Sequence, residues 1–132
     1  AIVVDDYGHH PQEISSTIDT FRKVWPEKRL VHVFQPHRYS RTQALHSQFV
    51  DALSLSDELF LMDIYSAGEA EIPGVSSEKL AEMIRSNNKN VTLTKSNSLK
   101  SLLDQFIQEG DVVLMQGAGN IGQLAVDLMT EE

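Results

Sequence analysis

Short apolar runs alternate with helical patterns along the whole of this 132-residue sequence. The runs have the length of strands and contain few polar residues, which is typical of strands that are buried on both faces. Strands separated by helices pair in parallel, because each helix carries the chain back across the sheet. The sequence therefore predicts a Rossmann-like, three-layer α/β domain with a mainly parallel sheet of five or six strands and flanking helices. The expected strands cover residues 1–4, 30–34, 59–64, 91–94 and 112–115.

The helices are expected between these strands, where apolar residues recur with the period of a helix. In the first of them, Ile14, Ile18, Phe21 and Trp25 fall on one face, and Pro11 suits the first turn. Hydroxyl side chains cap helix N-termini, which indicates where other helices begin. Those helices are expected to begin at Ser40, at Ser76 or Ser77, and at Ser98, and a last helix is expected over residues 121–129.

Composition limits the kind of protein. The length suits one domain over residues 1–132, and Lys+Arg number 11 against 19 Asp+Glu, a net charge of -8 that argues against a nucleic-acid partner. Cys is absent, which excludes disulfides and thiolate metal sites, and no apolar run is long enough for a membrane span. We expect a cytoplasmic protein with no membrane partner. Because the sequence opens on Ala1 rather than Met, we also expect a segment of a longer chain.

Polar residues gather where the first two expected strands end. One cluster spans residues 5–11 and the other spans residues 35–42. In an open α/β sheet, ligands bind outside the carboxyl ends of the strands. The two clusters are therefore expected to line one crevice, and residues 63–69 should lie at the same sheet edge because they follow the third strand.

Charged side chains in these clusters suggest how a ligand is held. Arg38 and Arg41 are three positions apart at a strand–helix junction, and two guanidinium groups on one side can clamp a carboxylate or a phosphate. The alternative is a pair of solvated surface arginines. Asp5 and Asp6 can order their loop or accept a hydrogen bond from a ribose hydroxyl.

Three histidines in the clusters raise the question of a metal site. His9 and His10 are adjacent, and adjacent histidines seldom bind one ion. No pair of histidines in the sequence, His37 included, has the H-x-x-x-H spacing. We therefore predict no intrinsic metal, and hydrogen bonding or substrate contact instead. His32 and His46 are expected to be structural or to lie on the surface.

Residues 117–122 match the pattern G-x-G-x-x-G after the last expected strand. A dinucleotide site also needs a ribose-binding acid about 20 residues further on, which this sequence does not offer. A tight turn with close packing is the favoured interpretation, and backbone amides facing an anionic substrate group are the alternative. Binding of NAD is the least favoured. The phosphate-binding motif G-x-x-x-x-G-K-[ST] does not occur.

In their order and spacing, several segments resemble the carboxy-terminal domain of the Mur ligases, and among these the ligases that join L-alanine to UDP-N-acetylmuramate. The likeness covers essentially the whole chain and rests on residues 5–11, 34–42, 65–69, 72–74 and 117–122. It implies an ATP-dependent enzyme of peptidoglycan synthesis with three domains, of which this chain is the third. The partners implied are the missing amino-terminal and central domains, together with UDP-N-acetylmuramate, L-alanine and ATP.

The resemblance also implies roles for individual residues. ATP and Mg²⁺ would be bound mainly by the central domain, so no cofactor is expected on this segment and the isolated chain is predicted to be inactive. The alternatives are a domain of the murein-peptide recycling ligase and a non-catalytic nucleotide-binding module. The implied roles are contact with L-alanine for Arg38, Arg41, His37, Tyr7 and His9, contact with the nucleotide for Asp6 and His10, and a possible substrate loop at Gly117, Ala118, Gly119 and Asn120.

Overall fold

A parallel sheet forms the middle layer of the computed structural model, which describes residues 2–87, 89–117 and 121. Within these residues the sheet has five strands in the order β1-β5-β2-β3-β4, and every neighbouring pair is parallel. The predicted fold class is therefore confirmed. The strands are β1 (Ile2–Asp6), β2 (Leu30–Gln35), β3 (Glu58–Met62), β4 (Asn90–Thr94) and β5 (Val112–Gly117).

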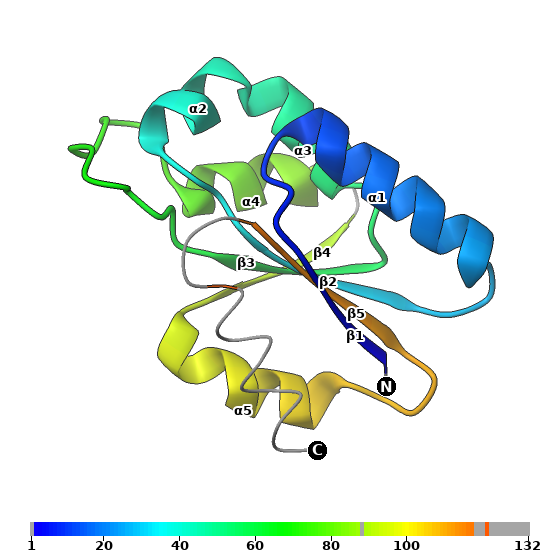
Figure 1. Ribbon diagram of the computed structural model, residues 1–132. Coiled ribbons are helices and arrows are strands. Elements are labelled where there is room, and N and C mark those ends of the chain that lie inside the picture. Colours follow the sequence, from blue (N-terminus) through cyan, green and yellow to red (C-terminus); the bar gives the residue numbers. More distant parts are fainter. Residues whose placement is uncertain (1, 88, 118–120, 122–132) are drawn as a thin grey trace.

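Helices cover both faces of the sheet (Figure 1). On one face lie α1 (Pro11–Val24), α3 (His46–Leu53) and α4 (Ser77–Arg85), with the short α2 (Tyr39–Ala44) beside α3. On the opposite face lies α5 (Ser96–Phe106). The result is the expected arrangement of three layers, in which the middle strands are covered on both sides.

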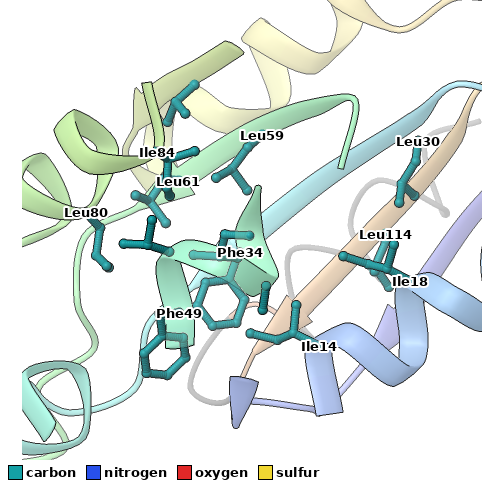
Figure 2. Close-up of a cluster of buried hydrophobic side chains, with 14 of the residues drawn as sticks. Ile14, Ile18, Leu30, Phe34, Phe49, Leu59, Leu61, Leu80, Ile84 and Leu114 are labelled. Carbon is teal, nitrogen blue, oxygen red and sulfur yellow. The ribbon is translucent and has the colours of Figure 1, made fainter. Parts of the chain in front are cut away.

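Two apolar clusters fill the spaces between the layers. The larger one joins the sheet to α1, α3 and α4, and Figure 2 shows Ile14, Phe34, Phe49 and Leu80 within it. The smaller one lies between the sheet and α5 and includes Leu103. Full burial of one such side chain contributes about 1.5–3 kcal/mol. These clusters therefore fix the sheet rigidly beneath the loops at its carboxyl edge.

Local signals place the start of two helices as predicted. In α1, Pro11 occupies the first helical position, and the Nδ1 atom of His10 accepts the Gln12 N–H at 3.2 Å. The Glu13 carboxylate accepts the His10 N–H at 3.1 Å, which completes a reciprocal cap. In α4, the Ser76 hydroxyl accepts the Lys79 N–H, so Ser76 is the cap.

Two predicted caps are wrong. Ser40 lies inside α2, which begins at Tyr39, because its hydroxyl and N–H both donate to Glu69. The helix expected from Ser40 onward is also broken at Leu45 into α2 and α3. Ser98 lies inside α5, whose first turn starts from the Lys95 carbonyl. In both helices the N-cap residue, Arg38 in α2 and Lys95 in α5, carries no hydroxyl and makes no side-chain cap, which is why the capping rule failed.

The first strand also differs from its prediction. It was expected to be buried, but among the described residues β1 is an edge strand that pairs only with β5, and Ile2 is 39% exposed. Asp5 and Asp6 are its last two residues, not the start of the following loop. The glycine segment 118–120 and the helix predicted over residues 121–129 lie outside the described residues, apart from Ile121. Among the described residues, no helix is long and apolar enough to cross a membrane.

Candidate functional site

The loops that follow β1, β2 and β3 meet at the carboxyl edge of the sheet. After β2 and β3, His37 and Tyr65 form an isolated parallel bridge, and their rings stack with centroids 5.6 Å apart. The Arg38 N–H donates to the Tyr65 carbonyl, and the Tyr65 N–H donates to the Pro36 carbonyl, both at 2.8 Å. Residues 63–69 therefore lie at the edge where the sequence predicted them.

Aromatic rings connect this bridge to the loop after β1. The His9 ring lies 5.6 Å from the His37 ring and 5.4 Å from the Tyr7 ring, measured between centroids. The Nδ1 atom of His9 is 3.1 Å from the Tyr7 carbonyl oxygen. A row of four rings, Tyr7–His9–His37–Tyr65, therefore joins the two polar clusters, and Tyr7 at its end is 72% exposed.

An open groove of ≈ 790 Å³ lies beside this row. Arg41 contributes to its wall, whereas Arg38 is exposed and does not line it. The pair of arginines that the sequence singled out is thus divided, with one guanidinium on the groove and the other outside it. The groove is lined by Asp6, Tyr7, Gly8, His9, His10, Gln12, Glu13, Ser16, Thr17 and Arg41.

The turn that carries both arginines is held by its neighbours. Arg38 has φ 72° and ψ 140°, a conformation that L-residues rarely adopt. Its carbonyl accepts the Thr42 N–H at 3.2 Å and the Thr42 hydroxyl at 2.8 Å. Glu69 accepts the Ser40 N–H at 3.1 Å and the Ser40 hydroxyl at 2.5 Å. The loop after β3 therefore fixes the backbone from which Arg41 projects.

The electrostatics of the site favour an anionic ligand near Arg41. Its Nη1 atom is enclosed and has no hydrogen-bond partner in the part of the chain that the structure describes. Burial lowers the pKa of His37, and the positive charges of Arg41 and Arg38 lower it further, so this ring is neutral near pH 7. Hydrogen bonds from Ser40 lower the pKa of Glu69, which keeps its carboxylate charged.

Asp6 is tied to the sheet by its Oδ2 atom. This oxygen accepts the Gly8 N–H at 3.0 Å and the side-chain amide of Gln116 at 2.8 Å. In turn, the Gln116 Oε1 lies 3.0 Å from the Nε2 of His32, and both of these side chains are fully buried. His32 was predicted to be structural or to lie on the surface, and Gln116 was not predicted to belong to the site, although a polar residue at the end of an apolar strand was a signal.

Two of the predicted site residues have structural roles. His10 caps α1 through Nδ1, so only its Nε2 is left to contact a ligand. Gly117 has φ 140°, and a Cβ there would lie 2.7 Å from the Gln35 carbonyl oxygen on the neighbouring strand β2, whereas the predicted packing of a helix on the strand involves residues outside the described ones. Ala118, Gly119 and Asn120 lie outside the described residues. Within the described ranges, no group of three or more His, Cys, Asp or Glu side chains could hold a metal ion.

A parallel α/β sheet with a polar groove at its carboxyl edge defines a class of ligand-binding domains. Within this class, the chain belongs to the family described as "Mur ligase, glutamate ligase domain". The model of this family matches residues 1–119.

Relatives of known name agree with this assignment. The chain is 74% identical over 129 residues to a UDP-N-acetylmuramate–L-alanine ligase of Legionella pneumophila (strain Lens), and it spans 98% of its own length but 28% of that protein. The structure of a UDP-N-acetylmuramate-alanine ligase from Thermotoga maritima superposes with a TM-score of 0.78 at 25% identity, over 98% of this chain and 26% of that one. A murein peptide ligase from Psychrobacter arcticus shares the fold, with a TM-score of 0.76 at 18% identity over 97% of this chain and 26% of that one.

Proposed function

We propose that this domain is the carboxy-terminal part of an ATP-dependent UDP-N-acetylmuramate–L-alanine ligase of peptidoglycan synthesis, and that it binds L-alanine and contacts ATP. The identity of 74% to a ligase of that name supports the assignment. A similar fold at 18% identity gives weaker support to the murein-peptide recycling ligase.

The reaction proceeds through an acyl phosphate. The carboxylate oxygen of UDP-N-acetylmuramate attacks the γ-phosphorus of ATP, and ADP leaves. The amine of L-alanine then attacks the acyl carbon and loses a proton, and inorganic phosphate leaves as the amide forms. Phosphoryl transfer and amide formation of this kind depend mainly on the orientation of the reactants and on the neutralisation of their charge. The contribution of this domain is therefore to orient the amine.

The observation that carries the alanine assignment is the enclosed, unpartnered Nη1 of Arg41 at a groove wall, within the described residues. When the Arg41 side chain turns this atom toward the groove, a bound carboxylate completes its hydrogen bonding and fixes the amino acid. The neutral His37 ring does not repel the amine, and Tyr7 and His9 form the remaining wall. Arg38, which is exposed, reaches the same carboxylate when a ligand and the neighbouring domains are in place.

Asp6 and His10 support a nucleotide contact. Both recorded hydrogen bonds to Asp6 fall on Oδ2, so among the described residues Oδ1 has no partner and can accept a ribose hydroxyl. Gly117, Ala118, Gly119 and Asn120 are proposed as a substrate loop that brings backbone amides to an anionic group. We propose that Mg²⁺ is held mainly by the central domain, and among the described residues no group of three or more His, Cys, Asp or Glu side chains could hold a metal ion.

The remaining length of the relatives suggests what the domain works with. Because the chain spans 28% of the Legionella ligase, we propose that amino-terminal and central domains supply the UDP-sugar site, the phosphate-binding loop and the Mg²⁺ ligands. The sequence itself has no phosphate-binding motif. Dependence on ATP and on a sugar nucleotide suggests the cytoplasm as the site of action.

Phosphate release tests the proposal. The full-length protein is incubated with ATP and UDP-N-acetylmuramate, and L-alanine or a tripeptide is added as the amine. We expect release to be stimulated by L-alanine and not by the tripeptide, and we expect none from the 132-residue chain alone. Stimulation by the tripeptide alone would identify the recycling ligase instead. Tight binding of ATP or NAD by this chain, without ligase activity in the full-length protein, would favour the nucleotide-binding module.

A further inference from the structure

A line of hydrogen bonds crosses the sheet beneath the groove. It begins at His32 on β2, passes through Gln116 on β5 and ends at Asp6 on β1. The two steps measure 3.0 Å and 2.8 Å, and Asp6 then accepts the Gly8 N–H at 3.0 Å. The line therefore connects the interior of the sheet to the backbone of the loop after β1.

The direction of these bonds follows from the chemistry of the groups. Asp6 accepts a hydrogen bond from the Gln116 amide nitrogen, so the amide oxygen faces His32 and accepts a hydrogen bond from the Nε2–H of that ring. A neutral imidazole that carries its proton on Nε2 meets this requirement. Burial lowers the pKa of His32 to about 4, although the Gln116 contact and the Asp6 charge act against the shift. The ring therefore stays neutral at any pH at which the protein would work.

Burial of these polar side chains lowers the stability of the fold. His32 and Gln116 are both 0% exposed within a sheet whose other central positions are mostly apolar. Polar side chains in such surroundings destabilise the fold unless each finds a partner. Here the Nδ1 of His32 is enclosed without a partner among the described residues, so the network is not fully satisfied. A purely structural network would gain more from apolar side chains.

The outer end of the line lies on the groove. Asp6 and Gly8 both line it. A Cβ at residue 8 would lie 2.7 Å from the Asp6 Oδ2 and 2.9 Å from the Gln116 Nε2, so the backbone packs directly against the network. The position of the groove wall is thus set by Gln116, and the position of Gln116 by His32.

We propose that His32 and Gln116 are positioning residues that hold the Asp6 carboxylate and the Gly8 backbone in the conformation that binds a hydroxyl-bearing ligand, the ribose of the nucleotide. This inference rests on the proposed function, because it takes ATP as the ligand of Asp6. The two buried residues do not touch the ligand. They act by keeping Oδ2 occupied, so that Oδ1 is turned to the groove.

Binding of ATP by the full-length protein tests this inference. Gln116→Met keeps the size of the side chain and removes both hydrogen bonds. We expect it to weaken ATP binding, measured by calorimetry, roughly tenfold, the effect of losing one hydrogen bond to a charged group. The KM for ATP should rise by a similar factor while the KM for L-alanine stays unchanged. Gln105→Met makes the same change at an exposed position on α5 and should alter neither constant.

Further variants separate positioning from stability. In a double-mutant cycle, Asp6→Ala and Gln116→Met should be less than additive in their effect on ATP binding, because either one removes the contact between these two side chains. His32→Gln places an amide donor near the Nε2 position and should retain ATP affinity that His32→Leu loses. This second pair also keeps the inference testable if Gln116→Met does not fold.

The outcomes are distinct. Folded Gln116→Met with wild-type ATP binding and a lowered Tm alone would show that the network is only structural and would overturn the inference. Equal losses in His32→Gln and His32→Leu would also contradict it. If the wild-type protein binds ATP but shows no response to L-alanine, the proposed function fails, and the calorimetric comparison of Gln116→Met with wild type still decides the role of the network.

Discussion

The backbone at Arg38 is expected to be strained, and this strain can be measured. Its φ of 72° and ψ of 140° lie outside the regions that L-residues favour. The conformation is imposed from several sides, because the Arg38 N–H donates to Tyr65 and its carbonyl accepts two hydrogen bonds from Thr42. Such conformations persist only where their surroundings over-determine them, and they gather at binding sites. Replacing Arg38 by glycine should therefore relieve the strain.

The matched comparison is between Arg38→Gly and Arg38→Ala. Both variants remove the exposed guanidinium, and only the glycine variant removes the Cβ. Relief of the strain should stabilise the glycine variant by about 1–3 kcal/mol. Glycine loses more backbone entropy on folding, which offsets roughly 0.5–1 kcal/mol of that gain. The net expectation is that Arg38→Gly is more stable than Arg38→Ala by up to about 2.5 kcal/mol.

Equilibrium unfolding in urea measures this difference, because the two midpoints can be compared at a common slope. If Arg38→Gly is instead less stable than Arg38→Ala by about 0.5–1 kcal/mol, the position behaves like an ordinary one and the strain does not exist. Both variants should bind L-alanine more weakly in the full-length enzyme. Strain held at the residue that is proposed to contact the ligand would mean that stability is given up for function at this turn.

Further predictions concern the packing of the sheet and its dependence on pH. Gly117→Ala should destabilise the domain by about 2–4 kcal/mol in urea unfolding, because its Cβ would meet the Gln35 carbonyl at 2.7 Å at a φ of 140°; a loss below about 0.5 kcal/mol would contradict this geometry. Asp111→Asn should lower the free energy of unfolding by about 2 kcal/mol, because the Asp111 carboxylate is 6% exposed and accepts two hydrogen bonds from Arg29. The control Glu82→Gln, which alters an exposed ion pair with Lys79, should change the free energy of unfolding by less than about 0.5 kcal/mol. Burial alone would raise the pKa of Asp111, but the hydrogen bonds from Arg29 and from the Gln108 N–H, together with nearby positive charge, outweigh it and lower the pKa. The stability that this group contributes is therefore present above about pH 4 and lost as the pH falls through the lowered pKa. An acid titration in which wild type and Asp111→Asn lose stability in parallel below pH 4 would refute this assignment.

The architecture could be predicted because its signal is local. Apolar runs and the helical spacing from Ile14 to Phe21 are visible in any short window, and they imply a parallel sheet without knowledge of contacts. The order of the strands depends on which strands meet in space, so the edge position of β1 could not be foreseen. The start of α2 was missed for a similar reason, since Ser40 is drawn away from capping by Glu69, a residue distant in the sequence.

The candidate site was predictable where residues cluster and hidden where they pair across strands. Tyr7, His9 and His37 stand in two short polar segments, and the rule for strand ends was enough to bring them together. Gln116 and His32 are isolated polar residues in mostly apolar strands, and their contact joins residues 84 positions apart. The unequal places of the two arginines depend on the backbone angles at Arg38, which the spacing alone does not determine.

The KM for L-alanine of the Arg41→Ala variant of the full-length enzyme tests the central claim most directly. Loss of a charge-assisted contact to the alanine carboxylate should remove about 1.5–3 kcal/mol of binding, which raises this KM roughly tenfold to a hundredfold. The KM for UDP-N-acetylmuramate should stay near its wild-type value, because Arg41 is proposed to contact only the amino acid. An unchanged KM for L-alanine would contradict the account, and a rise confined to the sugar nucleotide would move Arg41 to a different ligand.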